Sequence, residues 1–477
     1  MSNQKTAING AKWTTSATVI TTILNAAQTA IIARILAPSV FGLVSICTIM
    51  LSFFQVFANL GFANSIISTQ ETDKKKLSTI FFSSAGLGVI FCIVINLCSP
   101  LVVSFYHEPK LAAIIPLAAL NFPLIYSGQI YNTLLQKELR FKTIAVNDTL
   151  CVVASIVTTV TLAYNGFNEF AMMYGQLTWA GVRLISYTLT GIKLFRPVWH
   201  FKPKEIQDHL KFGIYSIGEG LLGFANSNLE NILIGRLISL EALGYYNIAW
   251  TLAIFPIYKL NPIIMQVSFP IMAKMKDNEG LKRAYLKIVD FITYCNFPIL
   301  TGLALTALGV VPLVFGHNFL PSVPLFKVVV FVGFLSCVTT PFASLSFSKG
   351  QPKLVFLLNL IVLLVKIPVI YIAAKYFGLI GITYGYLLAS IIETCVCFYF
   401  VTTLVGSILP QFLNNIYKPL SFCLAMVVAL LIYQYFLGTI GLVNIIAQVV
   451  IGAAVYVGLT LKFKMSLREV MDIKKSL

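Results

Sequence analysis

The stretch Ile32-Ala33-Arg34-Ile35-Leu36, followed four residues later by Phe41-Gly42-Leu43, returns 202 residues further along the chain. The second copy is Ile234-Gly235-Arg236-Leu237-Ile238 and then Leu243-Gly244-Tyr245, so an arginine and a glycine keep their places in both copies. Self-similarity at a fixed offset indicates a duplicated structural unit. In a membrane chain, two similar lobes are typical of transporters, which build a central pathway between them.

The composition is that of a membrane protein. Hydrophobic residues make up 58% of the chain and charged residues only 11%, whereas soluble domains usually carry about 25% charged residues. The mean hydropathy is +0.86. Apolar stretches of about 20 residues follow one another from Trp13 to Leu461, and each is long enough to cross a bilayer as a helix. We therefore predict an all-α polytopic membrane protein with about fourteen transmembrane helices.

The repeat predicts how these helices are grouped. Six helices form an N-terminal lobe over residues 1–205, and the longest basic loop separates it from a second six-helix lobe over 206–410. Residues 411–477 supply a further helix pair and a basic tail. Because six is even, both lobes enter the membrane in the same direction, which predicts a parallel repeat about an axis along the membrane normal. The expected spans are 13–36, 40–67, 78–103, 111–134, 144–164, 170–195, 212–237, 242–270, 286–315, 323–347, 354–376, 380–405, 417–437 and 441–461.

The net charge of +17 follows the topology. Of the 34 lysines and arginines, 26 lie in alternate loops and at the chain ends, and five lie on the opposite side. By the positive-inside rule, this asymmetry predicts that both termini are cytoplasmic, with the basic loops facing anionic lipid headgroups. The bilayer is therefore the expected partner of these charges, and nucleic acid is not.

Two predicted helices carry a polar face. In the first, polar side chains recur every three or four residues, and in the seventh, which is its repeat partner, they recur every four or seven. A carboxylate facing lipid is costly, so the glutamates should face a water-filled cavity or the other lobe. We interpret Thr18 and Thr22 as groups that join helices by hydrogen bonds. The residues expected to line a polar cavity or to couple an ion are Asn25, Gln28, Glu219, Asn226 and Glu230, with Glu393 of the twelfth helix.

Cationic side chains also lie within or at the ends of the predicted helices. A cavity lined by them would attract phosphate or pyrophosphate, which arginine can bind through two hydrogen bonds. The candidate substrate-binding cations are Arg34, Arg183, Arg236, Lys259 and Lys366. Two alternatives stay open: Arg34 and Arg236 could extend to the membrane interface from helix ends, and Lys366 could pair with Glu393.

The sequence carries no enzyme signature. The four histidines lie in or beside loops without a zinc-protease spacing, and a glycine-rich phosphate loop with its lysine is missing. The nine cysteines lie in apolar runs and predict neither a disulfide nor a metal site. We therefore expect a protein that is not an enzyme, holds no cofactor or metal, and takes its energy from an ion gradient or from the gradient of its substrate.

Several of these segments resemble bacterial polysaccharide flippases of the multidrug/oligosaccharidyl-lipid/polysaccharide (MOP) exporter superfamily, of the O-antigen and colanic-acid type. The resemblance covers the whole chain and is carried by residues 33–43, 57–62, 135–141 and 234–246. It implies a transporter in the bacterial inner membrane that moves undecaprenyl-pyrophosphate-linked oligosaccharides from the cytoplasmic to the periplasmic leaflet by alternating access. The product would be capsule, exopolysaccharide or O-antigen. Na+ or H+ coupling and a polysaccharide polymerase partner are further implications.

Three alternatives stand beside this interpretation. A cation-coupled multidrug exporter would use Glu219 or Glu230 to bind an ion or a drug, and a lipid II flippase would be essential to the cell. A polysaccharide polymerase or glycosyltransferase would need a large loop for its catalytic groups, and none of the predicted loops exceeds about 20 residues.

Overall fold

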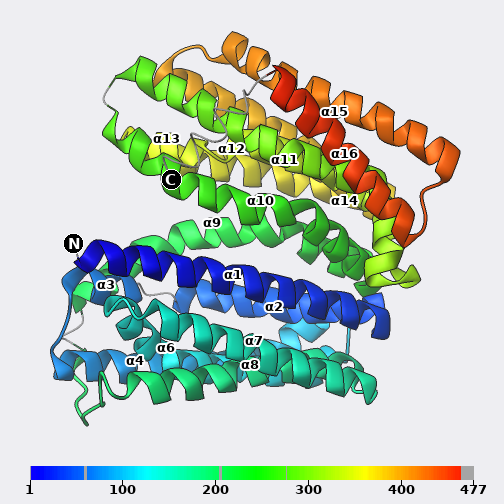
Figure 1. Ribbon diagram of the computed structural model, residues 1–477. Helices are drawn as coiled ribbons and strands as arrows, with labels where there is room; N and C mark the ends of the chain where they lie inside the picture. The colour runs from blue at the N-terminus through cyan, green and yellow to red at the C-terminus, as the bar shows by residue number, and fades with distance from the viewer. Residues whose placement is uncertain (1, 59–61, 204–206, 276, 464–477) are drawn as a thin grey trace. The chain divides into compact units, whose positions relative to one another are not determined.

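The computed structural model describes residues 2–58, 62–203, 207–275 and 277–463 (Figure 1). These residues are almost entirely helical. The helices up to the middle of the chain are α1 (Ser2–Ile35), α2 (Pro38–Ala58), α3 (Phe62–Thr69), α4 (Lys74–Tyr106), α5 (Leu111–Ala119), α6 (Asn121–Lys137), α7 (Phe141–Tyr164), α8 (Asn168–Gly191) and α9 (Gln207–Leu237). They are followed by α10 (Leu240–Lys274), α11 (Asn278–Phe315), α12 (Ser322–Thr339), α13 (Phe342–Ser348), α14 (Pro352–Val405), α15 (Leu409–Leu437) and α16 (Leu442–Phe463).

The fourteen predicted membrane helices are present. Eleven helical segments among the described residues are long and apolar enough to span a bilayer. One of them, α14, contains two helices joined at Gly378, whose φ of 62° and ψ of −145° break the helical path. The more polar α8 and α9, with 24 and 31 residues, complete the set. The predicted all-α polytopic fold is confirmed.

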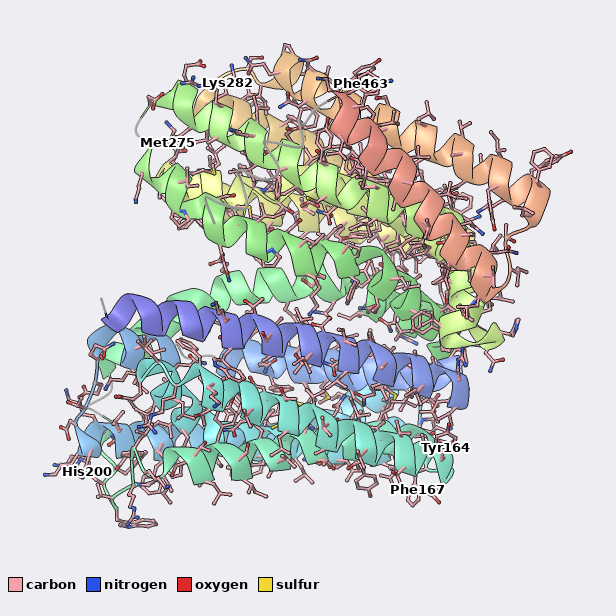
Figure 2. The ribbon with its side chains drawn as sticks, in the orientation of Figure 1. Tyr164, Phe167, His200, Met275, Lys282 and Phe463 are labelled. Carbon is pink, nitrogen blue, oxygen red and sulfur yellow. The ribbon has the colours of Figure 1, made fainter. Side chains whose placement is uncertain are left out.

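The chain divides into two compact units, residues 1–244 and 245–477. In the first unit, α7 packs against both α1 and α8, and α6 packs against both α4 and α8. Figure 1 shows α1, α7 and α8 running side by side. Figure 2 places Tyr164 and Phe167, at the α7–α8 turn, at one end of this unit and His200 at the other. The N-terminus lies at the His200 end, which we call the N-terminal end of the unit.

The compact division does not coincide with the predicted repeat boundary. Helix α9 packs against α2 and α3, and therefore belongs to the first compact unit, although the repeat assigns it to the second lobe. Sequence equivalence and packing are different properties, so lobes of 1–205 and 206–410 remain a prediction. The residues on either side of the 205/206 boundary, and the basic tail beyond Phe463, lie outside the described residues.

The repeated glycines make a reciprocal contact within the first unit. A Cβ added to Gly42 in α2 would lie 1.9 Å from the carbonyl oxygen of Leu240, and one added to Gly244 would lie 2.0 Å from the carbonyl oxygen of Pro38. Pro38 and Leu240 are themselves related by the 202-residue offset. Each repeat therefore presents a glycine to the first residue of the other repeat's helix, and only a residue without a Cβ allows the two backbones to approach this closely.

An ionic cluster stabilises the N-terminal end of the first unit. Glu71 accepts hydrogen bonds from the backbone N–H groups of Asp73 and Thr72, both at 2.9 Å, and forms an ion pair with Lys76 at 3.3 Å. The backbone bond from Asp73 contributes most to lowering the pKa of Glu71, and the other two partners add to it. This contribution to stability is therefore present at neutral pH and is lost when the pH falls through the lowered pKa. Lys137, at the end of α6, donates to the Glu71 carbonyl oxygen at 2.6 Å and ties α6 to the α3–α4 turn.

Replacing Lys137 by methionine should remove that tie while keeping the length and apolar stem of the side chain. We expect a loss of about 1 kcal/mol in the free energy of unfolding and a fall of about 2 °C in the thermal midpoint. Intrinsic tryptophan fluorescence of the purified protein during heating measures the midpoint. Lys193→Met is the control, because Lys193 is exposed and makes no hydrogen bond or ion pair with the described residues. Equal midpoints for the two variants would show that the tie contributes no stability.

The second unit has its core where α11, α12 and α14 meet. Tyr285, Phe342 and Val401 lie in a buried cluster contributed by α11, α13 and α14. The additional pair α15 and α16 packs together and against α11, as Figure 1 shows. Gln434 of α15 donates to the Leu305 carbonyl oxygen at 3.1 Å and to Gln448 Oε1 at 2.8 Å. One buried amide network therefore ties the C-terminal helix pair to α11.

Candidate functional site

A cavity of about 450 Å³ lies inside the first unit, among α1, α2, α6, α7 and α8. We call it the N-terminal cavity. Its lining combines side-chain amides and hydroxyls with aromatic rings. The amides are Asn25, Gln28, Gln55, Asn121 and Gln176, and the aromatic residues are Phe41, Phe122, Tyr126 and Trp179.

Helical periodicity places these side chains on the cavity wall. In α8, Met172, Gln176 and Trp179 are spaced by four and three residues and lie on one face. The cavity stripe of α2 has the same spacing, with Thr48, Ser52 and Gln55. In an otherwise apolar helix, such a stripe turns one polar face inward and leaves the other faces for lipid or for packing.

Two of the amides also hold the cavity together. Gln28 Nε2 donates to Thr159 Oγ1 at 3.2 Å, which links α1 to α7. Asn121 is buried and donates to the Ala118 carbonyl oxygen at 2.9 Å, across the break between α5 and α6. This hydrogen bond joins the first residue of α6 to the last turn of α5.

Three other amides are available to a ligand. The side chains of Asn25, Gln55 and Gln176 make no hydrogen bond to another group among the described residues, and all three line the cavity. An amide offers both donors and acceptors. Because no charged side chain lines the cavity among the described residues, it suits an uncharged, hydroxyl-rich molecule whose apolar faces contact aromatic rings.

A cation stands immediately beyond the cavity wall. Arg183 follows Trp179 by four residues in α8, about 6 Å further along the helix, toward the N-terminal end of the unit. Its guanidinium carbon lies 5.2 Å from the Trp179 ring centroid and 4.8 Å from that of Tyr187. Arg183 Nη1 donates to Asp148 Oδ1 at 3.0 Å. The aromatic rings fix the guanidinium plane, so a defined cation lies next to a neutral polar cavity.

The structure brings together only some of the residues that the sequence singled out. Asn25 and Gln28 line the N-terminal cavity, and Arg183 adjoins it through Trp179. Arg34 is exposed in the last turn of α1, and Arg236 lies 5.4 Å from the Phe105 ring near the end of α9. These positions accord with the alternative in which both arginines extend from helix ends.

The three polar residues of α9 lie apart from this cavity. Glu219 is exposed, Asn226 is half-buried and Glu230 is buried at 4% exposure. None of the three lines the N-terminal cavity. Their assignment to a polar pathway or an ion site stays a prediction.

The remaining predicted residues belong to the second unit. Lys259 is exposed in α10. Lys366 is 3% exposed, and its ammonium lies 4.4 Å from the Tyr386 ring centroid. A Cβ on Gly385 would lie 3.5 Å from the Ile370 Cα, so the two arms of α14 run antiparallel. With Gly385 facing Ile370, Glu393 lies no more than about two helical turns along the second arm from the position that faces Lys366.

The structure also identifies cavity residues that the sequence analysis missed, namely Gln55, Asn121, Gln176 and Trp179. A signal for most of them was present. The polar stripe of α2 and the line of Gln176, Trp179 and Arg183 in α8 both have helical spacing. Asn121 had no such signal, because its place depends on a helix break that follows from packing.

The family is established by comparison with known proteins. Residues 31–324, more than half of the chain, match the family model described as "Polysaccharide biosynthesis protein". The chain belongs to this family. Among the relatives of this polysaccharide biosynthesis protein, the lipopolysaccharide biosynthesis protein WzxC of Escherichia coli strain K12 is 32% identical, over 88% of this chain and 86% of the relative. The teichuronic acid biosynthesis protein TuaB of Bacillus subtilis strain 168 is 27% identical, over 88% of each chain.

Solved structures share the fold of this family member. Lipid II flippase MurJ in an inward closed conformation superposes with a TM-score of 0.77 at 14% identity, covering 96% of this chain and 99% of that one. An inward-facing multidrug resistance MATE family transporter of the MOP superfamily gives a TM-score of 0.64 at 14% identity, over 81% and 94%. The all-α transporter architecture expected from the resemblance is thereby confirmed.

Proposed function

We propose that this polysaccharide biosynthesis protein moves undecaprenyl-pyrophosphate-linked oligosaccharide units across the bacterial inner membrane for the assembly of a surface polysaccharide. It works by alternating access and is not an enzyme. Family membership supports this proposal. So does the succinoglycan biosynthesis transport protein ExoT of Rhizobium meliloti strain 1021, which is 22% identical over 66% of this chain.

The observation that carries the proposal is the pairing of a neutral cavity with an adjacent cation. Sugar hydroxyls both donate and accept hydrogen bonds, as do the amides of Asn25, Gln55 and Gln176. Trp179 and Tyr126 offer flat apolar surfaces to sugar rings. Arg183 offers the fork of N–H donors that phosphate prefers. A sugar joined to a pyrophosphate needs both kinds of partner within a few ångströms.

The proposal also includes the orientation of the chain. With both termini in the cytoplasm, the N-terminal end of the first unit faces the cytoplasm, and Arg183 lies on the cytoplasmic side of the N-terminal cavity. Basic residues follow α8, which ends on this side (Lys193), end α6 just before α7 begins (Lys137), and begin α4 beside the Glu71 cluster (Lys76), and they then obey the positive-inside rule. Arg183 is placed to meet the pyrophosphate of a substrate that arrives from the cytoplasmic leaflet. Coupling to Na+ or H+ and cooperation with a polysaccharide polymerase complete the proposal.

Replacing Gln176 by leucine tests the cavity assignment. The change keeps the size of the side chain but removes a donor and an acceptor, so sugar hydroxyls facing this position lose their partner. We expect a fall of about tenfold in surface polysaccharide in the host strain that lacks its own copy of the protein and carries the variant. Immunoblotting of membranes verifies equal protein levels.

Gln411→Leu is the matched control, because Gln411 is exposed near the start of α15 and should export normally. Normal export by Gln176→Leu at normal protein levels would refute the sugar-binding role of this cavity. Drug sensitivity with intact polysaccharide in the deletion strain would instead support a multidrug exporter, and cell lysis on depletion would support a lipid II flippase.

A further inference from the structure

The Arg183 guanidinium is only partly used by the protein. It can donate five N–H groups, and its single hydrogen bond among the described residues is the one to Asp148 Oδ1. Trp179 and Tyr187 hold its plane by contacts with their ring faces, and these contacts use none of its remaining N–H donors. A structural arginine in a membrane helix would be expected to have more of its donors satisfied.

Asp148 is an unusual partner for such a cation. Its side chain is 41% exposed, whereas that of Arg183 is 16% exposed. Both of its hydrogen bonds end on the same oxygen, since the Tyr187 hydroxyl donates to Oδ1 at 2.8 Å. The second oxygen accepts no hydrogen bond from the described residues. A partly exposed carboxylate can separate from its partner at lower cost than a fully buried one.

Position links this ion pair to the N-terminal cavity. In α7, Asp148 lies seven residues before Ser155, which lines the cavity, so the two share a face. In α8, Arg183 lies seven residues after Gln176, which also lines the cavity. The ion pair therefore continues the cavity wall by about two turns beyond Ser155 on α7 and by about one turn beyond Trp179 on α8.

We propose that Asp148 is a displaceable counter-ion for Arg183. When the site is empty, the carboxylate neutralises the guanidinium, which spares the membrane interior an uncompensated charge. A phosphate group then takes its place, because it carries more charge and more acceptor oxygens than a carboxylate and can bind the guanidinium through two hydrogen bonds. The displaced Asp148 keeps the hydroxyl of Tyr187 as a donor, and its return to Arg183 favours release of the substrate. This inference rests on the proposed function, which supplies the pyrophosphate.

Binding of geranyl pyrophosphate, a short polyprenyl pyrophosphate, to the purified full-length protein tests the proposal. Nanodiscs of phosphatidylcholine carry no net charge, which limits competition from lipid headgroups, and isothermal titration calorimetry measures the dissociation constant. Asp148→Asn removes the competing charge with little change of shape, so we expect binding about tenfold tighter. Arg183→Gln should bind about tenfold more weakly. The double variant should match Arg183→Gln, because Asp148 acts only through the arginine.

The controls separate this inference from general electrostatics and from the proposed function. Asp290→Asn in α11 removes the same charge elsewhere and should leave the affinity unchanged. Geraniol, which lacks the pyrophosphate, should show no difference among the variants, and inorganic pyrophosphate reports the phosphate contribution alone. Repeating the titration with phosphatidylglycerol nanodiscs reveals whether a lipid headgroup also displaces Asp148.

The outcomes distinguish a failure of the counter-ion inference from a failure of the proposed function. Unchanged or weaker binding by Asp148→Asn, with weaker binding by Arg183→Gln, would show that Asp148 only positions the arginine, and would overturn this inference while leaving the proposed function intact. Unchanged binding by Arg183→Gln would overturn the inference together with the assignment of Arg183 to the pyrophosphate. In the host strain, Asp148→Asn should export polysaccharide more slowly than the wild type despite its tighter binding, because release is delayed.

Discussion

Replacing Gly42 or Gly244 by alanine is expected to destabilise the protein strongly, although each change adds only one methyl group. Each added Cβ would meet a backbone carbonyl oxygen at about 2 Å, and a backbone segment cannot move aside as a flexible side chain can. Overpacking of this kind typically costs about 1–3 kcal/mol. We expect a lower thermal midpoint for each purified variant and reduced polysaccharide export at equal expression.

The reciprocity of the contact makes a sharper test possible. Either alanine forces the same two segments apart, residues 38–42 and 240–244, so the second substitution should cost less than the first. The double variant should therefore be more stable than the sum of the single effects predicts, with a coupling energy of about 1 kcal/mol or more. Additive effects would show that the two glycines act independently.

Gly86→Ala provides the matched control. Gly86 lies inside α4, and a Cβ added there has no heavy atom within 4 Å. Alanine is a better helix former than glycine, so this variant should be as stable as the wild type or slightly more stable. A loss equal to that of Gly42→Ala would indicate a general intolerance of glycine substitution instead of a specific close approach.

Replacing Trp179 by alanine is expected to cause the largest loss of transport. Trp179 lines the N-terminal cavity and also contacts the Arg183 guanidinium at 5.2 Å. Its removal takes away an aromatic surface for the sugar and one of the two rings that hold the Arg183 guanidinium. The change therefore weakens both the sugar site and the phosphate site. We expect polysaccharide export to fall by more than about tenfold, the effect of losing a contact worth about 1.4 kcal/mol or more.

Trp199→Ala is the control for this variant. Trp199 is 96% exposed and packs edge to face on Phe82 at 5.2 Å, in the loop after α8 and outside the cavity lining. Trp179→Phe should recover part of the export, because phenylalanine keeps a ring but offers a weaker surface to the cation. Equal export by Trp179→Ala and Trp199→Ala would contradict the placement of the site in the N-terminal cavity.

Much of the architecture could be predicted from the sequence because hydropathy is a local property. A window of about 20 apolar residues identifies a membrane helix whatever surrounds it, which is why all fourteen predicted spans correspond to helices. The equal spacing of Arg34 and Arg236, and of Gly42 and Gly244, likewise revealed the duplication without any structural information.

The candidate site was predicted less completely. A single ionisable residue in an apolar helix is easily recognised in a sequence, but the residue with which it pairs is not. Arg183 was recognisable as a charge in an apolar run, and Asp148 is also a charge inside a predicted helix, but the two residues are 35 positions apart and nothing in the sequence indicates that they meet. Gln55 and Gln176 are uncharged and did not stand out, although they line the same cavity as Asn25 and Gln28.

The sequence by itself determined the class of the protein, the number of its membrane helices and the existence of a repeat, since these depend on composition and on intervals along one chain. Only the tertiary structure decided which faces of the helices meet. The packing of α7 against α8 brings Asp148 into contact with Arg183. The close approach of the two repeated segments explains why residues 42 and 244 are both glycine. Such contacts depend on side-chain packing between distant segments, and no local pattern encodes that packing.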